Sequence, residues 1–362
     1  MSKTYYKNIF FGYSKILFFT FIGFFLIILI FDILEISRIT TKYSLKFTLV
    51  IRLALMKNYS SLSQTIPMII LISSLLHYNS KNKNNELIAA KSIGISNFNI
   101  ILPVISAVLI FGIINITIIN PIGTMLLKKY QNYEANKFKK EKSLISISKS
   151  GIWLKNKFNN QNLIINALRV SQISNTMNDV KIFFINEDGE LEKQIFSKLI
   201  AFKSQSIIIQ NATIIDKNFK ILKEKELILP IKISISQILE NFTTIDTISF
   251  FELLNFIKIT KESGLSINKY LLFFLKELMS PIYIVSMSLI SFFFSNRVNN
   301  RKKYNLTFLY GLTVGFIIYF LTNFIYALGS SGSVSVFLAA FFPTITSNII
   351  ALYLILYKNN QI

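Results

Sequence analysis

The residues with the most specific chemistry lie in a short polar segment, 84–94, between two long apolar runs. It reads Asn84-Asn85-Glu86-Leu87-Ile88-Ala89-Ala90-Lys91-Ser92-Ile93-Gly94. Asparagine can cap the start of a helix, a carboxylate suits the positive N-terminal end, and glycine suits the position after the last turn. We therefore expect a short helix whose small residues let a partner protein approach closely. The helix could dock in a groove of that partner. The alternative is a plain interfacial turn.

A second candidate site is basic. Arg38 and Lys42 are four residues apart just after the first apolar run, so a helix would place them on one face. A basic collar of this kind attracts the phosphate or carboxylate groups of an amphiphilic substrate. The alternative is a solvated helix face on which Glu35 pairs locally with Arg38.

Catalytic chemistry is poorly represented. The chain has no Cys and a single His, which makes metal sites and histidine acid–base catalysis improbable. It contains no G-x-x-x-x-G-K-[ST] nucleotide-binding loop, no G-x-S-x-G and no H-E-x-x-H. His77 is interpreted as an interfacial residue, with a proton relay as the alternative. We expect no catalytic residues, no metal and no cofactor in this chain.

The composition indicates a membrane protein. Hydrophobic residues make up 52% of the 362 positions, and the mean hydropathy is +0.50. Because a charge at bilayer depth is costly, long uncharged runs mark the spans, each needing about 20 residues. Six spans are predicted at roughly 14–34, 60–79, 98–120, 272–295, 305–326 and 334–356. Pro67 and Pro281 are expected to kink two of them, and Gly311 and Gly315 form a G-x-x-x-G that allows close helix approach.

The stretch 121–270 differs, since it holds 14 of the 18 acidic residues and 22 of the 39 basic ones. Strands are predicted from 151, over 180–185, 191–202 and 206–215, and over 231–235, where Ile alternates with polar residues. Ser249 and Glu252 form a capping box that predicts a connecting helix over 249–263, ended by Gly264. The predicted fold is an α-helical bundle of six transmembrane helices with an inserted, jelly-roll-like all-β domain.

The charges of the short loops predict the orientation. Lys and Arg concentrate at the N-terminus, after the second and fourth spans, and in the tail. Both termini are therefore expected in the cytoplasm and the β domain in the periplasm. The basic segment between the first two spans, from Arg38 to Lys57, does not follow this rule, and these charges therefore favour a substrate role.

Taken together, the plan resembles the LptF/LptG permease family of the lipopolysaccharide export transporter. The 85–94 segment is similar to that family's coupling-helix signature S-E-L-x-x-x-x-A-S-G, though not identical to it. Gly151-Ile152-Trp153 resembles the G-x-W of the LptG branch, which we favour. The other stretches that carry the resemblance are Pro67-Met68, 248–253, Ser263-Gly264-Leu265 and Pro281.

The resemblance implies a division of labour along the chain. Residues 1–120 would hold three spans and the coupling helix 84–94, 121–270 the periplasmic domain, and 271–362 the last three spans. Coupling to an ATPase would fall to Glu86, Leu87, Ala90 and Gly94, and substrate binding to Arg38 and Lys42.

The resemblance also implies the partners. They would be a second permease of the family in a heterodimer, a cytoplasmic ABC ATPase dimer that uses the ATP, periplasmic jelly-roll bridge proteins, and lipopolysaccharide, with no nucleic acid. The implied function is to extract lipopolysaccharide from the bacterial inner membrane for delivery to the outer membrane. The alternatives are a permease of another lipid or lipoprotein exporter, and a membrane-bound enzyme acting on lipid-linked sugars.

Overall fold

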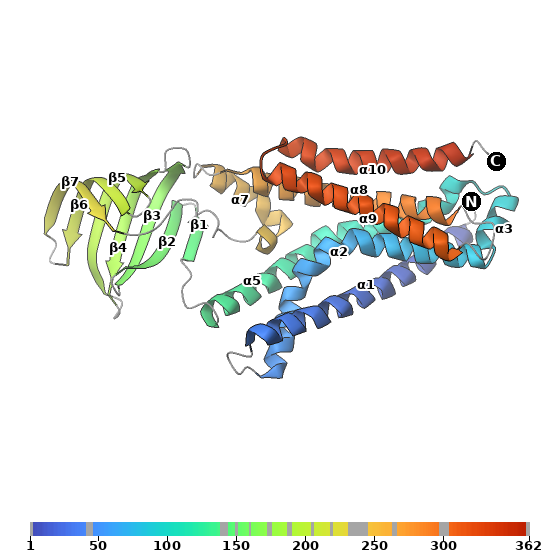
Figure 1. Ribbon diagram of the computed structural model, residues 1–362, viewed down its shortest axis with the longest axis horizontal. Helices are drawn as coiled ribbons and strands as arrows, with labels where there is room; N and C mark the ends of the chain where they lie inside the picture. The colour runs from blue at the N-terminus through green and yellow to red at the C-terminus, as the bar shows by residue number, and fades with distance from the viewer. Residues whose placement is uncertain are drawn as a thin grey trace. The chain divides into compact units, whose positions relative to one another are not determined.

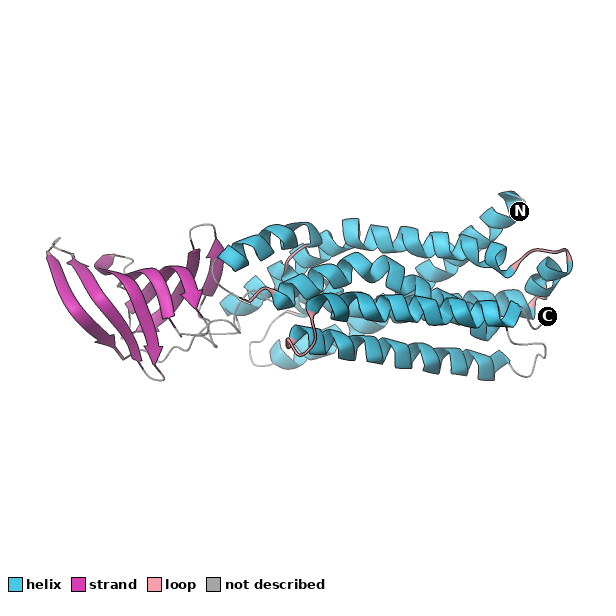
Figure 2. Cartoon of the chain, turned by 90° about the horizontal axis from the view of Figure 1, so that it is seen from above, coloured by secondary structure: helices cyan, strands magenta, loops and turns pink. Residues whose placement is uncertain are grey.

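The structure is a computed structural model that describes residues 3–40, 46–137, 144–148, 151–158, 161–171, 176–186, 190–203, 206–217, 220–230, 245–262, 266–296 and 304–359. The chain divides into two compact units. The first joins Met1–Tyr130 to Leu271–Ile362, and the second is Gln131–Tyr270. Helices make up the first unit, and all the described strands belong to the second (Figures 1 and 2).

The helical unit is a bundle of long helices with one short helix at its end (Figure 1). Its elements are α1 (Lys3–Thr40), α2 (Phe47–Lys83), α3 (Glu86–Ser92), α4 (Asn97–Ile114), the π-helical turn η2 (Asn115–Ile119), α5 (Asn120–Lys137), α8 (Asn268–Ser295), α9 (Tyr304–Ser330) and α10 (Val336–Asn359). The two chain ends and α3 lie at the same end of this bundle (Figures 1 and 2).

Six helices of the described chain are long and apolar enough to cross a membrane, which confirms the predicted number. The first three membrane helices are α1, α2 and the continuous run of α4, η2 and α5. They are longer than the uncharged runs of the sequence, because a helix can continue past the hydrocarbon with charged side chains on its outer turns. α1 reaches Thr40 and α2 begins at Phe47. The basic residues Arg52 and Lys57 therefore belong to α2, whereas the uncharged run had placed them in a loop.

The G-x-x-x-G motif packs within the chain. A Cβ atom at Gly311 would lie 2.8 Å from Leu75 Cδ2, and one at Gly315 would lie 2.3 Å from Leu71 Cδ2. The two glycines thus let α9 approach α2 more closely than any larger residue would allow. The Tyr319 hydroxyl strengthens this contact, since it donates to the backbone carbonyl of Gln64 at 3.1 Å.

The β unit is one antiparallel sheet in which each described strand pairs with its neighbours in sequence. Its strands are β1 (Leu144–Ser148), β2 (Gly151–Phe158), β3 (Gln161–Ser171), β4 (Thr176–Ile185), β5 (Leu191–Lys203), β6 (Ser206–Asp216) and β7 (Ile221–Leu229). The inserted all-β domain is confirmed. Over the described strands its connections are those of a meander, whereas a jelly roll has crossings between two sheets.

Alternating side chains of β2 to β7 build a single hydrophobic core. The alternation of buried and exposed side chains reverses along one line across the sheet, although the pairing register is constant across that line. On β4 the buried residues are Met177 and then Val180, and between them Asp179 has a φ of +51°. On β6 the same reversal occurs at Asn211, with a φ of +49°. Asp and Asn tolerate this left-handed backbone better than other residues, so the sheet can bend and keep one buried face.

Gly151 has a physical reason to be glycine. Its φ is +103°, and a Cβ atom there would lie 2.3 Å from the carbonyl oxygen of Ala167 on β3. Two residues later, the Trp153 ring stacks on Phe183 with 6.5 Å between centroids. The G-x-W motif therefore combines a close backbone approach with a stacked aromatic pair.

The strands predicted from 151, over 180–185, 191–202 and 206–215 are confirmed, while β1, β3 and β7 had not been predicted. The strand predicted over 231–235 lies outside the described residues. A short 3-10 turn, η3 (Ile245–Thr247), precedes the connecting helix, α7 (Phe250–Glu262). The amides of Glu252 and Leu253 both donate to the Ser249 carbonyl at 3.0 Å. Gly264 lies outside the described residues.

Candidate functional site

The short helix α3 is closed at its C-terminal end by a Schellman motif. The Gly94 amide donates to the Lys91 carbonyl at 2.9 Å, and the Ile95 amide donates to the Ala90 carbonyl at 3.0 Å. Gly94 has a φ of +84°, as its predicted role requires. At the other end Asn85 occupies the cap position with a φ of +59°, but its side chain makes no capping hydrogen bond. The predicted side-chain cap is therefore wrong, and the left-handed backbone of Asn85 differs from the extended conformation that an N-cap residue usually adopts.

α3 has one face in the bundle core and one face exposed. Leu87 is 2% exposed and Ala90 is 3% exposed, and both pack in the main hydrophobic cluster of the bundle. Ile88 is 50% exposed and Ile93 is 77% exposed. Two of the residues expected to couple to an ATPase thus anchor the helix, and the neighbouring apolar residues are the ones that a partner could touch. The spacing of Leu87 and Ala90, three residues apart, was the signal for this division.

Glu86 lies at the rim between these two faces. Its Oε2 atom lies 2.6 Å from Nζ of Lys81 on the last turn of α2. The pair is partly exposed, with 42% of the Glu86 side chain accessible. A carboxylate on the first turn of a helix is favourable in itself, and the ion pair holds it near the junction of α2 and α3.

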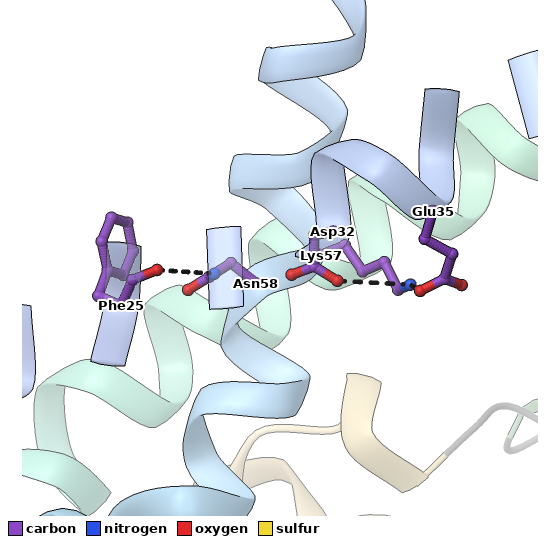
Figure 3. Close-up of polar contacts among 5 residues, drawn as sticks. All are labelled: Phe25, Asp32, Glu35, Lys57 and Asn58. Atoms are coloured by element: carbon purple, nitrogen blue, oxygen red, sulfur yellow. Dashed lines mark hydrogen bonds and ion pairs between the residues drawn. The ribbon is translucent and has the colours of Figure 1, made fainter. Parts of the chain in front are cut away.

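At the opposite end of α1 and α2, three charged side chains meet (Figure 3). Lys57 on α2 points between two carboxylates of α1, with Nζ 3.5 Å from Asp32 Oδ1 and 2.5 Å from Glu35 Oε2. Asp32 is 3% exposed, whereas 59% of the Glu35 side chain is accessible. The next residue of α2, Asn58, donates to the backbone carbonyl of Phe25 on α1 at 3.4 Å. This ionic cluster joins α1 to α2.

One of the two predicted substrate residues, Arg38, lies beyond this cluster. Arg38 is exposed on the last turn of α1, and Lys42 lies outside the described residues. The sequence prediction counted Lys57 among the basic residues of this segment but did not foresee its ion pairs. The only sequence signal for these ion pairs was the presence of two carboxylates, Asp32 and Glu35, within one turn of each other before Arg38.

An apolar cavity of about 250 Å³ lies between α1, α2, the π-helical turn and α5. Its walls include Phe21, Phe25, Tyr59, Leu62, Ile119 and Ile122. Phe25 precedes Asp32 by seven residues, so the cavity lies roughly 10 Å along the helix from the ionic cluster. Gly123 makes room for the Tyr59 ring, since a Cβ atom there would lie 2.0 Å from that ring. An apolar chain and a charged group could thus be accommodated along one helix pair.

His77 is buried in the bundle, where 2% of it is exposed. Its ring meets those of Tyr13 and Tyr78 edge-on, with 5.5 Å between centroids in each case. The Tyr13 hydroxyl is in turn within hydrogen-bond distance of Ser73 and Ser74. The residue is therefore packed inside the bundle, between α1 and α2.

The comparison with protein families gives one match, described as lipopolysaccharide export system permease LptF/LptG, over residues 7–357. A search of curated proteins finds no match. The family holds both branches, and the match does not separate LptG from LptF. The match covers the bundle, α3 and the β unit alike. The similarity to this family therefore extends over nearly the whole chain and is not limited to separate motifs. The chain belongs to the LptF/LptG family of lipopolysaccharide export permeases and is a multi-pass protein of the inner membrane.

Proposed function

We propose that this chain is one permease subunit of an ABC transporter that extracts lipopolysaccharide from the inner membrane, driven by ATP hydrolysis in a partner. The family match over residues 7–357 carries the proposal. The transporter would contain a second permease of the same family and two copies of the ATPase, and this chain needs no cofactor of its own. Depletion of the chain should leave lipopolysaccharide in the inner membrane, as fractionation of the two membranes measures. Normal delivery to the cell surface would refute the proposal.

The orientation follows from the number of spans and from the charges. With six spans the two termini lie on one side of the membrane, and an insert after the third span lies on the other. The short basic loops support an orientation in which the termini and α3 would lie in the cytoplasm. The β unit would then lie in the periplasm, where it would pass lipid to bridge proteins through strand-edge pairing.

The ATPase would dock on the exposed face of α3. Ile88 and Ile93 supply apolar surface, and Glu86 supplies a charge at its rim. Such a face suits a groove in a partner that is apolar at its centre and basic at its edge. Gly94 ends the helix there, and Leu87 and Ala90 hold it against the bundle.

Substituting Glu86→Lys should abolish or strongly weaken capture of the ATPase. The substitution reverses the charge at this rim and puts a second positive charge beside Lys81. Co-purification of the ATPase with the detergent-solubilised permease measures the effect. Glu190→Lys is a matched control, since Glu190 is also an exposed carboxylate paired with a lysine, Lys217, at 2.7 Å. Equal capture by the wild type and both variants would contradict docking on α3.

Lipopolysaccharide is an amphiphile, and the α1–α2 pair offers both kinds of contact. Arg38 and Lys42 would bind its phosphorylated headgroup, and the apolar cavity beside Phe21 and Phe25 would receive an acyl chain. The exposed apolar side chains of α1 and α9 would face lipid or the second permease.

Charge reversal at Arg38, alone or with Lys42, should lower photo-crosslinking of lipopolysaccharide to the end of α1 several-fold, because each substitution replaces attraction to phosphate with repulsion. A photoreactive residue at the exposed position of Leu34 reports the contact. Lys7→Glu is the control, since Lys7 is exposed at the opposite end of the same helix. Unchanged crosslinking in the Arg38 variant would remove this residue from the substrate path.

A further inference from the structure

The short helix α3 is fastened to two helices. It follows α2 directly, and it is also tied to the C-terminal end of α8, more than 200 residues away in sequence. Lys91 Nζ on α3 donates to Asn296 Oδ1 at 2.5 Å, immediately after the last residue of α8. On the last turn of α2, Asn82 Nδ2 donates to the backbone carbonyl of Ser295. These two hydrogen bonds join three segments at one point.

The end of α8 needs such partners. The last carbonyls of a helix have no amide donor within the helix, and their partial negative charge favours a cation nearby. Asn82 supplies a donor to one of these carbonyls, and the ammonium of Lys91 lies beside the same helix end. α2 thus supplies a donor, and α3 a nearby cation, to the C-terminal end of α8.

The contact is internal to the bundle. Asn82 is 4% exposed and Ser295 is 1% exposed. Lys91 is half-buried, and its burial lowers the pKa of the ammonium. Burying the strongly hydrated ammonium of Lys91 costs free energy. A lysine that served only solubility would be fully exposed, so the position of Lys91 indicates a structural role.

One turn further into the bundle, α8 is fixed to α2 again. The Ser291 hydroxyl lies 2.9 Å from the Leu71 backbone carbonyl and 2.8 Å from the Met287 carbonyl of its own helix, and both Ser291 and Leu71 are fully buried. The last turns of α8 therefore have little freedom to slide against α2. A displacement of α3 reaches α8 through a packed and hydrogen-bonded junction, and not through a flexible loop.

We propose that Lys91 and Asn82 are positioning residues that make α3 and the C-terminal end of α8 move as one body. A displacement of α3 by the ATPase would then be delivered directly to α8, the helix by which the chain returns from the β unit. This inference rests on the proposed docking of the ATPase on α3. It adds that docking and transmission are carried by different residues, Glu86 for the first and Lys91 with Asn82 for the second.

The test separates binding from coupling. The complete transporter, with its co-purified ATPase, is reconstituted in proteoliposomes with lipopolysaccharide, and both ATP hydrolysis and ATP-dependent lipid release are measured. Lys91→Met and Asn82→Leu remove the donors and keep similar volume. Each should leave the amount of bound ATPase unchanged and lower the lipid released per ATP roughly threefold or more.

Two matched variants sharpen the result. Lys91→Arg keeps a cationic donor and should restore most of the release per ATP. Lys83→Met removes an exposed lysine at the same end of the bundle and should have no effect. Release per ATP equal to wild type in both Lys91→Met and Asn82→Leu would overturn the inference. Loss of bound ATPase in Lys91→Met would overturn it too, since Lys91 would then belong to the docking surface.

A second measurement does not depend on the stability of the Met and Leu variants. The chain has no cysteine, so Lys91→Cys with Asn296→Cys creates one pair of thiols. A short bis-thiosulfonate reagent can bridge them across the space of the removed lysine side chain. If α3 and α8 move together, the bridged transporter keeps ATP-dependent release, and a bridged transporter that is blocked would refute the inference. Absence of release in the wild type would instead count against the proposed function itself.

Discussion

Replacing Lys57 by Met should destabilise the bundle by about 3 kcal/mol, the lower part of the range for breaking a buried ion pair by removal of one partner. The reason is Asp32, which is 3% exposed and has its Oδ1 atom 3.5 Å from the Lys57 ammonium. Without that ammonium a buried carboxylate loses its compensating charge. Denaturant unfolding of the detergent-solubilised chain measures the change, and the α1–α2 contact should open first.

Substitutions of the two carboxylates that pair with Lys57 test whether the buried charge causes the loss of stability. Asp32→Asn in the Lys57→Met background removes the stranded charge and should restore most of the lost stability. Glu35→Gln alone should cost only about 0–1 kcal/mol, because 59% of that side chain is accessible and water screens the pair. A Lys57→Met variant as stable as the wild type would show that the cluster is not a tie between α1 and α2.

Substituting Gly315→Leu should destabilise the bundle by about 1–3 kcal/mol through overpacking. The first added carbon would already lie 2.3 Å from Leu71 Cδ2, and Leu71 is fully buried. α9 would have to move away from α2, which would also weaken the hydrogen bond from Tyr319 to the Gln64 carbonyl. The free energy of unfolding and the cysteine-crosslinking yield between α2 and α9 measure the two effects.

A matched glycine gives the control. Gly23 on α1 has no atom within 4 Å of the position of a Cβ atom, so Gly23→Leu should be tolerated. Combining Gly315→Leu with Leu71→Ala returns volume to the contact and should recover part of the stability. Equal stability of Gly315→Leu and Gly23→Leu would mean that the motif does not determine the α2–α9 distance.

The membrane plan was predictable because its cause is local. A charged side chain at bilayer depth is costly whatever surrounds it, so the uncharged runs located all six spans. Their ends were less predictable, because a helix continues into water wherever its own hydrogen bonds and its neighbours support it. This is why Arg52 and Lys57 were expected in a loop and are found on α2.

For the β insert, the sequence likewise predicted individual elements but not how they are arranged. Runs of β-branched and aromatic residues identified β2, β4, β5 and β6, since such a composition and the turn residues around it are visible in a single segment. The meander order and the reversal at Asp179 and Asn211 depend on which strand pairs with which. β7 lies at the edge of the described sheet with most of its residues exposed, so it lacks the alternation by which a strand is detected.

The sequence by itself determined the short helix after the second span, its closing glycine and the charge at its rim, because capping and the helix dipole act over a few residues. Only the tertiary structure decided that Lys91 reaches Asn296 and that Lys57 lies between Asp32 and Glu35. These contacts join residues that are between 22 and 205 positions apart. Their partners are chosen by how whole helices pack, and no spacing within one segment records that choice.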